Sequence, residues 1–258
     1  MILQQIGTVV RRTKSFYYVD IGETEPLYCR VRGRYFIRNS QIDKIAVGDK
    51  VEIDKSSNKN IGLILNVLPR RSKLSRRNQV EPEQVLASNA DTLLMVASIR
   101  NPPFRSGLID RFLVAGSCGG LEPFLILSKT DLATTKEKIP IIELYSSLGY
   151  KVLETSVLEN KGLEKLKKLI QNRISVLSGH SGVGKSSLIS ALFPNWGIRI
   201  GDISEKSGKG KHTTIMSEMF RIPNGGFIID TPGIRSFEPI VTKKELDSHF
   251  VEFIPFLG

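Results

Sequence analysis

The stretch Gly179-His-Ser-Gly-Val-Gly-Lys-Ser186 decides the fold, because it matches the pattern GxxxxGK[ST] in full. It follows the apolar segment 174–178 (ISVLS) and leads into KSSLISALF at 185–193, which reads as the start of an amphipathic helix. The glycines let successive backbone N–H groups approach phosphate oxygens, and the helix start adds partial positive charge. The stretch therefore predicts a nucleotide site in which Lys185 contacts the β- and γ-phosphates.

Two later segments fit the same site. Asp230-Thr-Pro-Gly233 follows the apolar residues 225–229 (GGFII) and reads as DxxG. Asp230 would lie near a Mg²⁺ ion, and the N–H of Gly233 would contact the γ-phosphate. The loop 208–214 (GKGKHTT) supplies Thr213 and Thr214, either of which would complete the Mg²⁺ shell with Ser186.

Ser128-Lys-Thr-Asp131 ends another apolar segment and is similar to the guanine-reading pattern NKxD, with Ser in place of Asn. The carboxylate of Asp131 would accept hydrogen bonds from the ring N–H and the amino group of guanine, which adenine lacks at that edge. The Lys129 stem would lie along the face of the base. Glu154-Thr-Ser156 takes the place of the short loop whose backbone contacts the guanine carbonyl. The full set of predicted GTP-binding residues is Ser128, Lys129, Thr130, Asp131, Thr155, Ser156, Gly179, His180, Ser181, Gly182, Val183, Gly184, Lys185, Ser186, Ser187, Thr213, Thr214, Asp230 and Gly233.

The order of these motifs is unusual. In most GTPases the phosphate loop comes first and the base-reading elements come last, whereas here 128–131 and 154–156 precede 179–186. This order indicates a circular permutation, which a compact domain tolerates because its two ends commonly lie close together.

Buried strands and amphipathic helices alternate from residue 91 onward. The apolar runs 91–99, 123–128, 151–155, 174–179 and 227–230 are typical of strands buried on both faces. Helical patterns at 109–117, 139–148 and 162–172 lie between them. We therefore expect an α/β fold, with a circularly permuted P-loop GTPase domain at 90–240 and a short C-terminal segment at 241–258.

The first part of the chain has a different character. Residues 1–77 contain 16 Lys and Arg against 7 Asp and Glu, a net charge of +9 out of +11 for the whole chain. Short strands separated by turns predict an OB-fold β-barrel at 1–70, followed by a linker at 71–89. Such barrels bind single-stranded nucleic acid with basic grooves and exposed aromatic rings. Candidate stacking residues are Phe16, Tyr17, Tyr18, Tyr28, Tyr35 and Phe36, about half of which must fill the barrel, and the candidate RNA-binding residues are Arg11, Arg12, Arg32, Arg34, Arg70, Arg71, Arg76 and Arg77.

Composition excludes several classes of protein. Hydrophobic residues make up 40% and charged residues 24% of the 258, which is ordinary globular usage and argues against a largely disordered chain. No apolar run approaches the ~20 residues that span a bilayer. Two cysteines provide neither a disulfide framework nor a four-cysteine zinc site. The first residues lack the pattern of a signal peptide, so we expect a cytoplasmic protein with no membrane contact.

The basic barrel, the permuted order, the KHTT loop (211–214) and the segment DTPGIRSFE (230–238) together resemble the RsgA (YjeQ) family. The resemblance covers essentially the whole chain. It implies a GTPase that acts with Mg²⁺, binds the small ribosomal subunit and its rRNA, and serves late in the maturation of that subunit. The family also carries a C-terminal zinc module after a stretch like 250–253 (FVEF), so the resemblance implies zinc. The Cys and His ligands of that module are absent from this sequence, so either the chain is truncated or the module is missing.

The catalytic apparatus differs from that of many GTPases. Ile234 stands where a water-orienting Gln often follows DxxG, so intrinsic hydrolysis should be slow. We assign the catalytic roles to Lys185 and to His212, whose imidazole, or else a ribosomal group, would orient the attacking water. Two alternatives remain open at this stage: a nucleotide-sensing RNA-binding module with little hydrolysis, and a P-loop kinase or ATPase. We expect a monomer.

Overall fold

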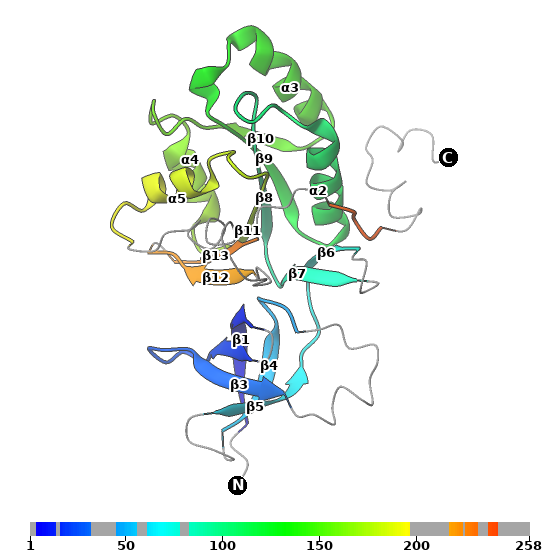
Figure 1. Cartoon of the computed structure of the whole chain (residues 1–258), viewed down its shortest axis with the longest axis vertical. Helices are drawn as coiled ribbons and strands as arrows, with labels where there is room; N and C mark the ends of the chain where they lie inside the picture. The colour runs from blue at the N-terminus through cyan, green and yellow to red at the C-terminus, as the bar shows by residue number, and fades with distance from the viewer. Residues whose placement is uncertain are drawn as a thin grey trace, which may run out of the picture.

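The computed structural model describes residues 4–13, 16–31, 45–55, 61–77, 83–196, 217–223, 225–231 and 237–241. Two parts are visible in Figure 1, with a β-barrel below and a helix-covered sheet above. No helix in these ranges is long and apolar enough to cross a membrane.

The N-terminal part is the closed barrel that the sequence predicts. Its strands are β1 (Gln4–Arg12), β2 (Tyr17–Asp20), β3 (Leu27–Val31), β4 (Lys50–Asp54) and β5 (Gly62–Val67). They pair in the order β1-β2-β3-β5-β4, and β4 pairs back to β1. Alternate residues point inward, and the core consists of Val9, Tyr17, Val19, Cys29, Ile45, Val51, Ile53 and Ile64. Because β4 pairs with β1, the barrel has no free strand edge, and the backbone groups of its short strands are paired all the way round.

The segment 71–89, predicted to be a linker, contains a two-stranded sheet. β6 (Lys73–Arg76) pairs antiparallel with β7 (Gln84–Ser88). Leu74 and Leu86 are buried in the core of the second part, while Lys73 forms an ion pair with Glu83. The charged residues between these apolar ones make the segment look like a linker in sequence.

The second part is built on a parallel sheet. β8 (Thr92–Ser98), β9 (Glu122–Ser128), β10 (Lys151–Glu154), β11 (Ile174–Ser178) and β13 (Phe227–Asp230) lie in the order β10-β9-β8-β11-β13. All five were expected. β12 (Glu218–Arg221), which was not, adds an antiparallel strand beside β13.

Helices cover both faces of this sheet. They are α2 (Ser106–Cys118), α3 (Thr135–Ser147), α4 (Leu163–Ile170) and α5 (Lys185–Leu192). Leu93 and Met95 of β8 lie in one core cluster with residues of α2 and α3, whereas Leu94 and Val96 lie in the other with residues of α4 and α5. Figure 1 shows the two helix pairs on opposite sides of the sheet. The continuous apolar run of β8 is thus explained by burial on both faces.

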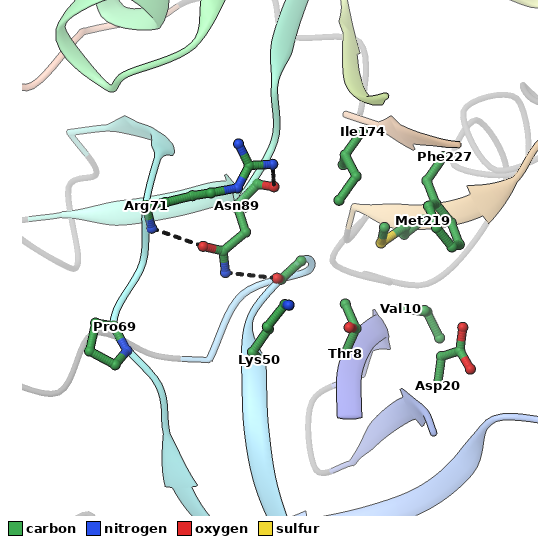
Figure 2. A pocket seen from close by; sticks show the side chains of 11 residues that line it. Thr8, Val10, Asp20, Lys50, Pro69, Arg71, Asn89, Ile174, Met219 and Phe227 are labelled. Atoms are coloured by element: carbon green, nitrogen blue, oxygen red, sulfur yellow. Dashed lines mark hydrogen bonds between the residues drawn. The ribbon is translucent and has the colours of Figure 1, made fainter. Parts of the chain in front are cut away.

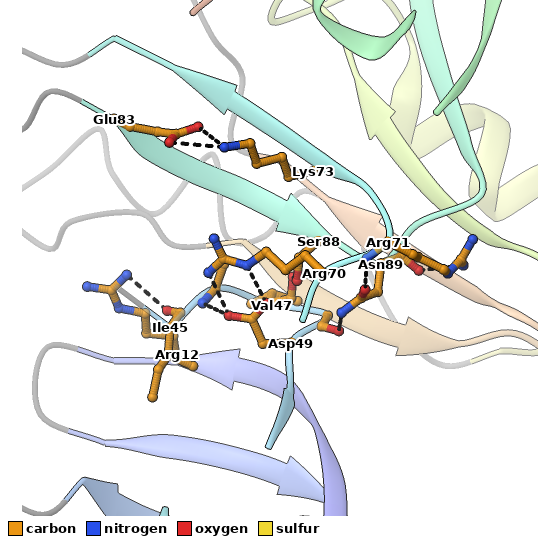
Figure 3. A network of polar contacts seen from close by, with 12 residues as sticks. Arg12, Ile45, Val47, Asp49, Arg70, Arg71, Lys73, Glu83, Ser88 and Asn89 are labelled. Carbon is orange, nitrogen blue, oxygen red and sulfur yellow. Dashed lines mark hydrogen bonds and ion pairs between the residues drawn. The ribbon is translucent and has the colours of Figure 1, made fainter. Parts of the chain in front are cut away.

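The two parts meet at a tight junction. The turn at 45–49 approaches the end of β7, where Ser88 N–H donates to the Val47 carbonyl (2.9 Å) and Asn89 Nδ2 donates to the Gly48 carbonyl (2.9 Å). Figure 3 shows these contacts around the buried ion pair of Asp49 with Arg70. β1 also pairs with β12, so hydrogen bonding continues from the barrel into the second sheet.

A cavity of about 480 Å³ lies beside this junction. Figure 2 shows that both parts contribute its walls. Val10, Ile174, Met219 and Phe227 provide apolar surface, and Asp20, Lys50 and Arg71 add charged groups to the lining. The barrel is therefore held to the parallel sheet at the 45–49 turn and at β12, with the cavity between these two contacts.

Candidate nucleotide-binding site

The predicted nucleotide motifs meet at one edge of the parallel sheet. Ser128, Glu154, Ser178 and Asp230 are the last residues of four parallel strands, and carboxyl ends of parallel strands lie on the same edge. Open α/β sheets bind ligands at this edge. The permuted chain therefore builds a single site from segments far apart in sequence.

The phosphate loop has the backbone that its glycines permit. Residues 179–184 connect β11 to α5, and Gly182 and Gly184 have φ values of 82° and 96°. Gly179 has φ 150°, and a Cβ there would lie 2.3 Å from the Val96 carbonyl oxygen. A side chain at Gly179 would therefore clash with the backbone of β8, whereas at Gly182 and Gly184 the positive φ is what disfavours a residue with a Cβ.

The side chain of Lys185 packs against the backbone of the phosphate loop. Its Nζ donates to the carbonyl of Gly179 (2.8 Å) and lies 3.3 Å from that of His180. Burial lowers the pKa of this ammonium, and the nearby Asp230 carboxylate opposes the shift. A cation held against the backbone of a glycine-rich loop is suited to binding phosphate.

Asp230 lies at the end of β13, where its backbone pairs with Leu177 of β11. Its Oδ1 is buried and has no hydrogen-bond partner among the residues that the structure describes. Burial raises the pKa of Asp230 to about 6, with Lys185 lowering it and Glu218 raising it further. A buried carboxylate oxygen without a donor is a suitable ligand for a hydrated Mg²⁺, so the donor set fits that ion.

Hydrogen bonds join the two predicted base-reading segments, 128–131 and 154–156. Ser156 Oγ donates to Asp131 Oδ1 (2.6 Å), which orients the carboxylate. Thr130 N–H donates to the Thr155 carbonyl (3.2 Å), and Thr155 N–H donates to that of Leu127 (2.7 Å). The hydroxyls of both threonines lie within hydrogen-bond distance of backbone carbonyls, so these residues shape the site from inside the fold.

Two bridges connect the base-reading segment to the phosphate loop. Lys129 Nζ donates to the carbonyl of Gly182 (2.6 Å) and to that of Asn101 (2.6 Å). Ser128 Oγ lies 2.5 Å from the Val183 carbonyl and 3.1 Å from that of Ala97. Ser128 is buried, so its single hydroxyl proton fixes the loop against β8 and β9. Ser128 is one of the predicted GTP-binding residues, and in this structure its hydroxyl lies within hydrogen-bond distance of the backbone of the loop and of β8.

Other residues of the loop face outward. Ser181 and Ser187 are exposed, and His180 lies beside Arg105 with 3.5 Å between Nε2 and the guanidinium. Ser186 is half-buried in the first turn of α5. The predicted residues His212, Thr213, Thr214, Gly233 and Ile234 lie outside the described residues, as do Arg32, Arg34, Tyr35 and Phe36.

Sequence reasoning missed the loop after β8. The Asn101 carbonyl accepts from Lys129, and Pro102 lies 3.8 Å from the position that a Cβ on Gly182 would take. Ser98 Oγ donates to the Pro102 carbonyl (2.8 Å), which holds this loop to the strand. The available signal was the Asn-Pro-Pro turn directly after a buried strand, at the edge where the other motifs lie.

Several predicted RNA-binding arginines are engaged within the chain. Arg70 makes two bonds to the buried carboxylate of Asp49 (2.7 and 2.8 Å), as Figure 3 shows. Arg71 pairs with Asp91 (2.7 Å) and donates to the Asn89 carbonyl (2.6 Å). Arg12 donates to the Ile45 carbonyl (3.2 Å), and Arg76 donates to Gln84 (2.9 Å). Arg11 and Arg77 are exposed. The high charge of 69–77 thus serves partly to join the two parts.

Among the described residues, no group of three or more His, Cys, Asp or Glu side chains could hold a metal ion by itself. The Mg²⁺ site predicted above would instead combine one carboxylate with hydroxyl and phosphate oxygens, as is usual for this ion.

The fold and the site together define a circularly permuted P-loop GTPase. The family model described as RsgA GTPase matches residues 67–239, and the model described as RsgA N-terminal domain matches residues 6–64. The chain therefore belongs to the RsgA GTPase family, and it is a GTP-hydrolysing enzyme.

Individual relatives agree. The chain is 38% identical to "Small ribosomal subunit biogenesis GTPase RsgA" of Chlorobaculum parvum over 97% of its own length and 84% of that protein. It is 36% identical to the protein of the same name from Shewanella oneidensis, over 99% of this chain and 72% of that one. The crystal structure of YjeQ from Thermotoga maritima is similar with a TM-score of 0.72 and 30% identity, covering 97% of this chain and 83% of that one. YloQ, described as a circularly permuted GTPase, is similar with a TM-score of 0.65 and 26% identity, covering 97% and 79%.

Proposed function

We propose that this protein binds the small ribosomal subunit, assists its late maturation, and hydrolyses GTP when the subunit stimulates it. The observation that carries the proposal is the joining of Asp131 and Ser156 to the phosphate loop through Lys129 and Ser128, because this arrangement supports one site for both ends of a guanine nucleotide. The relatives' names supply the subunit. We further propose that the protein acts as a monomer in the cytoplasm, where it meets the subunit and its rRNA.

In this proposal the chain's own groups do most of the work by positioning and charge. The loop N–H groups and the Lys185 ammonium bind the β- and γ-phosphates and stabilise charge that develops between them. Asp131 selects guanine over adenine, and Lys129 covers the face of the base. Ser186 and Asp230, with Thr213 or Thr214, would hold Mg²⁺ directly or through water. When bound, that ion neutralises phosphate charge.

The water-orienting group is the open part of the mechanism. Ile234 has no polar atom in its side chain, so it orients no water, and intrinsic turnover should be slow. We assign the role to His212, within a loop whose glycines and lysines suit it to closing over a triphosphate. A group from the subunit is the competing source.

Measuring hydrolysis of GTP and of ATP, with and without purified small subunits, tests the proposal. Stimulated GTP turnover with little ATP turnover is the expected result. His212→Ala should lower the stimulated rate, while His249→Ala, a histidine with no assigned role, should leave it unchanged. Fast ATP hydrolysis without subunits would instead favour a metabolic ATPase, and no turnover under any condition would favour a nucleotide-sensing RNA-binding module.

A further inference from the structure

Five side chains on the outer face of the barrel form a continuous row of rings capped by guanidinium groups. We call it the Arg–aromatic row, and its members are Arg11, Phe16, Tyr18, Tyr28 and Arg30.

Strand register produces this row. Tyr18 of β2 pairs with Tyr28 of β3, and Arg11 of β1 pairs with Tyr18. The β1–β2 ladder shifts by one residue between Val9 and Arg11. Without that bulge, Val10 would stand opposite Tyr18, so the extra residue brings Arg11 into line with the tyrosines. Bulges commonly re-aim a side chain in this way.

The contacts within the row are close. The rings of Phe16 and Tyr28 stack with centroids 4.4 Å apart, and Tyr18 meets Tyr28 edge-on at 5.6 Å. The Arg11 guanidinium lies 3.9 Å from the centre of the Tyr18 ring, and that of Arg30 lies 4.7 Å from the centre of Phe16. Each end of the row is therefore a planar cation with N–H donors at its edge.

The rings of the Arg–aromatic row are not part of the barrel core. Tyr17, Val19 and Cys29 alternate with them along the same strands and fill the interior. Phe16, Tyr18 and Tyr28 remain half-exposed, and Arg11 and Arg30 are exposed. Arg11 also lies 3.7 Å from Glu218, a loose ion pair that leaves most of its donors available. A surface of aromatic faces and guanidinium planes has the chemistry on which unpaired RNA bases stack, while the same arginines contact phosphates.

We propose that the Arg–aromatic row is a stacking platform for unpaired RNA bases. The inference rests on the proposed function, because it names the part of the rRNA that the barrel would bind: a single-stranded segment rather than a duplex. A-form duplexes keep their bases stacked inside, so a row of rings offers them little beyond its charge. The row takes Phe16, Tyr18 and Tyr28 from the stacking candidates of the sequence and Arg11 from the RNA-binding candidates, and Arg30 is the member that the sequence did not predict.

The test measures binding of the full chain to fluorescein-labelled RNA by anisotropy, with a 12-nucleotide single strand and a hairpin duplex of the same composition. We expect tighter binding of the single strand. Tyr28→Ala should weaken it about tenfold to a hundredfold, the usual loss for one stacking ring. Tyr28→Phe keeps the ring and should bind like the parent, and Tyr150→Ala, a tyrosine in the GTPase domain, is the control for an unrelated site. Thermal unfolding of each variant verifies that the barrel is folded.

Arg30 separates stacking from charge. Arg30→Lys keeps the positive charge and loses the plane, so it should weaken single-strand binding while leaving the salt dependence unchanged. Arg30→Ala should reduce both. Equal affinity for single strand and duplex, or equal affinity of Tyr28→Ala and the parent, would overturn the inference.

Hydrolysis of GTP with small subunits is measured in parallel on the same preparations. Stimulated turnover without single-strand binding would reject the platform and leave the proposed function standing. Absence of stimulated turnover would reject the proposed function whatever the RNA result.

Discussion

Arg11 of the barrel and Glu218 of the GTPase sheet stand directly opposite each other where β1 pairs with β12, with 3.7 Å between their charged groups. Glu218 in turn stands opposite Asp230 on β13. These three charged residues therefore form a row across three strands, from the surface of the barrel to the buried carboxylate of the nucleotide site. Burial raises the pKa of Glu218, and Arg11 opposes that shift, so the barrel stabilises the charged form of a residue beside Asp230.

This pair should contribute little to stability. The two side chains are 45% and 23% exposed, and ion pairs of this kind couple by about 0.2–1 kcal/mol. A double-mutant cycle of Arg11→Ala and Glu218→Gln, followed by urea unfolding, should give a coupling free energy in that range. A coupling of several kcal/mol would mean that the ion pair itself, rather than the 45–49 turn, holds the two parts together.

Asp131→Asn should change which base is bound. The variant replaces a carboxylate that accepts two N–H groups of guanine with an amide whose NH₂ opposes one of them, and a hydrogen bond to a charged group contributes about 1.5–3 kcal/mol. We expect GTP affinity to fall about a hundredfold. Affinity for xanthosine triphosphate should rise, because xanthine offers a carbonyl where guanine has its amino group. Competition titration with a fluorescent guanine nucleotide measures both.

Ser156→Ala is the matched control for that change. It removes the hydroxyl that orients Asp131 but leaves the carboxylate in place. About a tenfold loss of GTP affinity, with no gain for xanthosine triphosphate, is the expected outcome. If Asp131→Asn kept its preference for GTP, guanine would have to be selected by another group.

Much of the nucleotide site could be predicted from the sequence, because each of its motifs is a short continuous segment. The phosphate loop, the segment 128–131 and Asp230 each end a run of apolar residues, so strand boundaries and chemistry coincide there. Every residue of β8 is buried, so the strand appears in the sequence as the continuous apolar run that is typical of a parallel sheet.

The missed elements depend on long-range contacts. β12 has only four residues and no apolar run, and it forms because β1 and β13 flank it. In the sequence, Arg70 has the features of a residue that binds RNA phosphates. In the fold it lies against Asp49, which is 21 residues earlier in the chain, and bonds to that carboxylate instead. Likewise, the roles of Ser128 and Lys129 in holding the loop come from carbonyls more than 50 residues later in the chain.

Gly48→Ala should loosen the junction between the two parts. Gly48 has φ 94°, and a Cβ there would lie 2.0 Å from the Ser88 carbonyl oxygen, which belongs to the backbone and cannot rotate away. We expect a loss of about 2–4 kcal/mol in the free energy of unfolding, measured by urea denaturation. Gly107→Ala is the matched control, since nothing lies within 4 Å of its Cβ position and it is in α2. Gly107→Ala should raise the free energy of unfolding by about 0.5–1 kcal/mol. Similar losses of stability in the two variants would show that the contact between Gly48 and Ser88 does not hold the two parts together.

The two cysteines should differ in their reactivity toward alkylating reagents. Burial raises the pKa of Cys29 to about 12, whereas Cys118 is half-exposed. Alkylation by iodoacetamide requires an accessible thiolate, so the half-exposed Cys118 should be labelled in the folded protein at about pH 8, while Cys29 reacts only after unfolding. Peptide mass spectrometry identifies the labelled residue, and rapid labelling of Cys29 in the folded protein would contradict the closed barrel.

The same pKa predicts a loss of stability in alkali. The unfolded thiol releases its proton near pH 9, but the folded thiol keeps it to about 12. Between these values the folded state binds more protons than the unfolded state, so the free energy of unfolding falls as the pH rises. Cys29→Ala removes this contribution and leaves every other titrating group in place. Its free energy of unfolding, measured in urea from pH 8.5 to 10.5, should therefore decline less steeply than that of the parent, and parallel slopes would show that Cys29 ionises as readily in the barrel as in the unfolded chain.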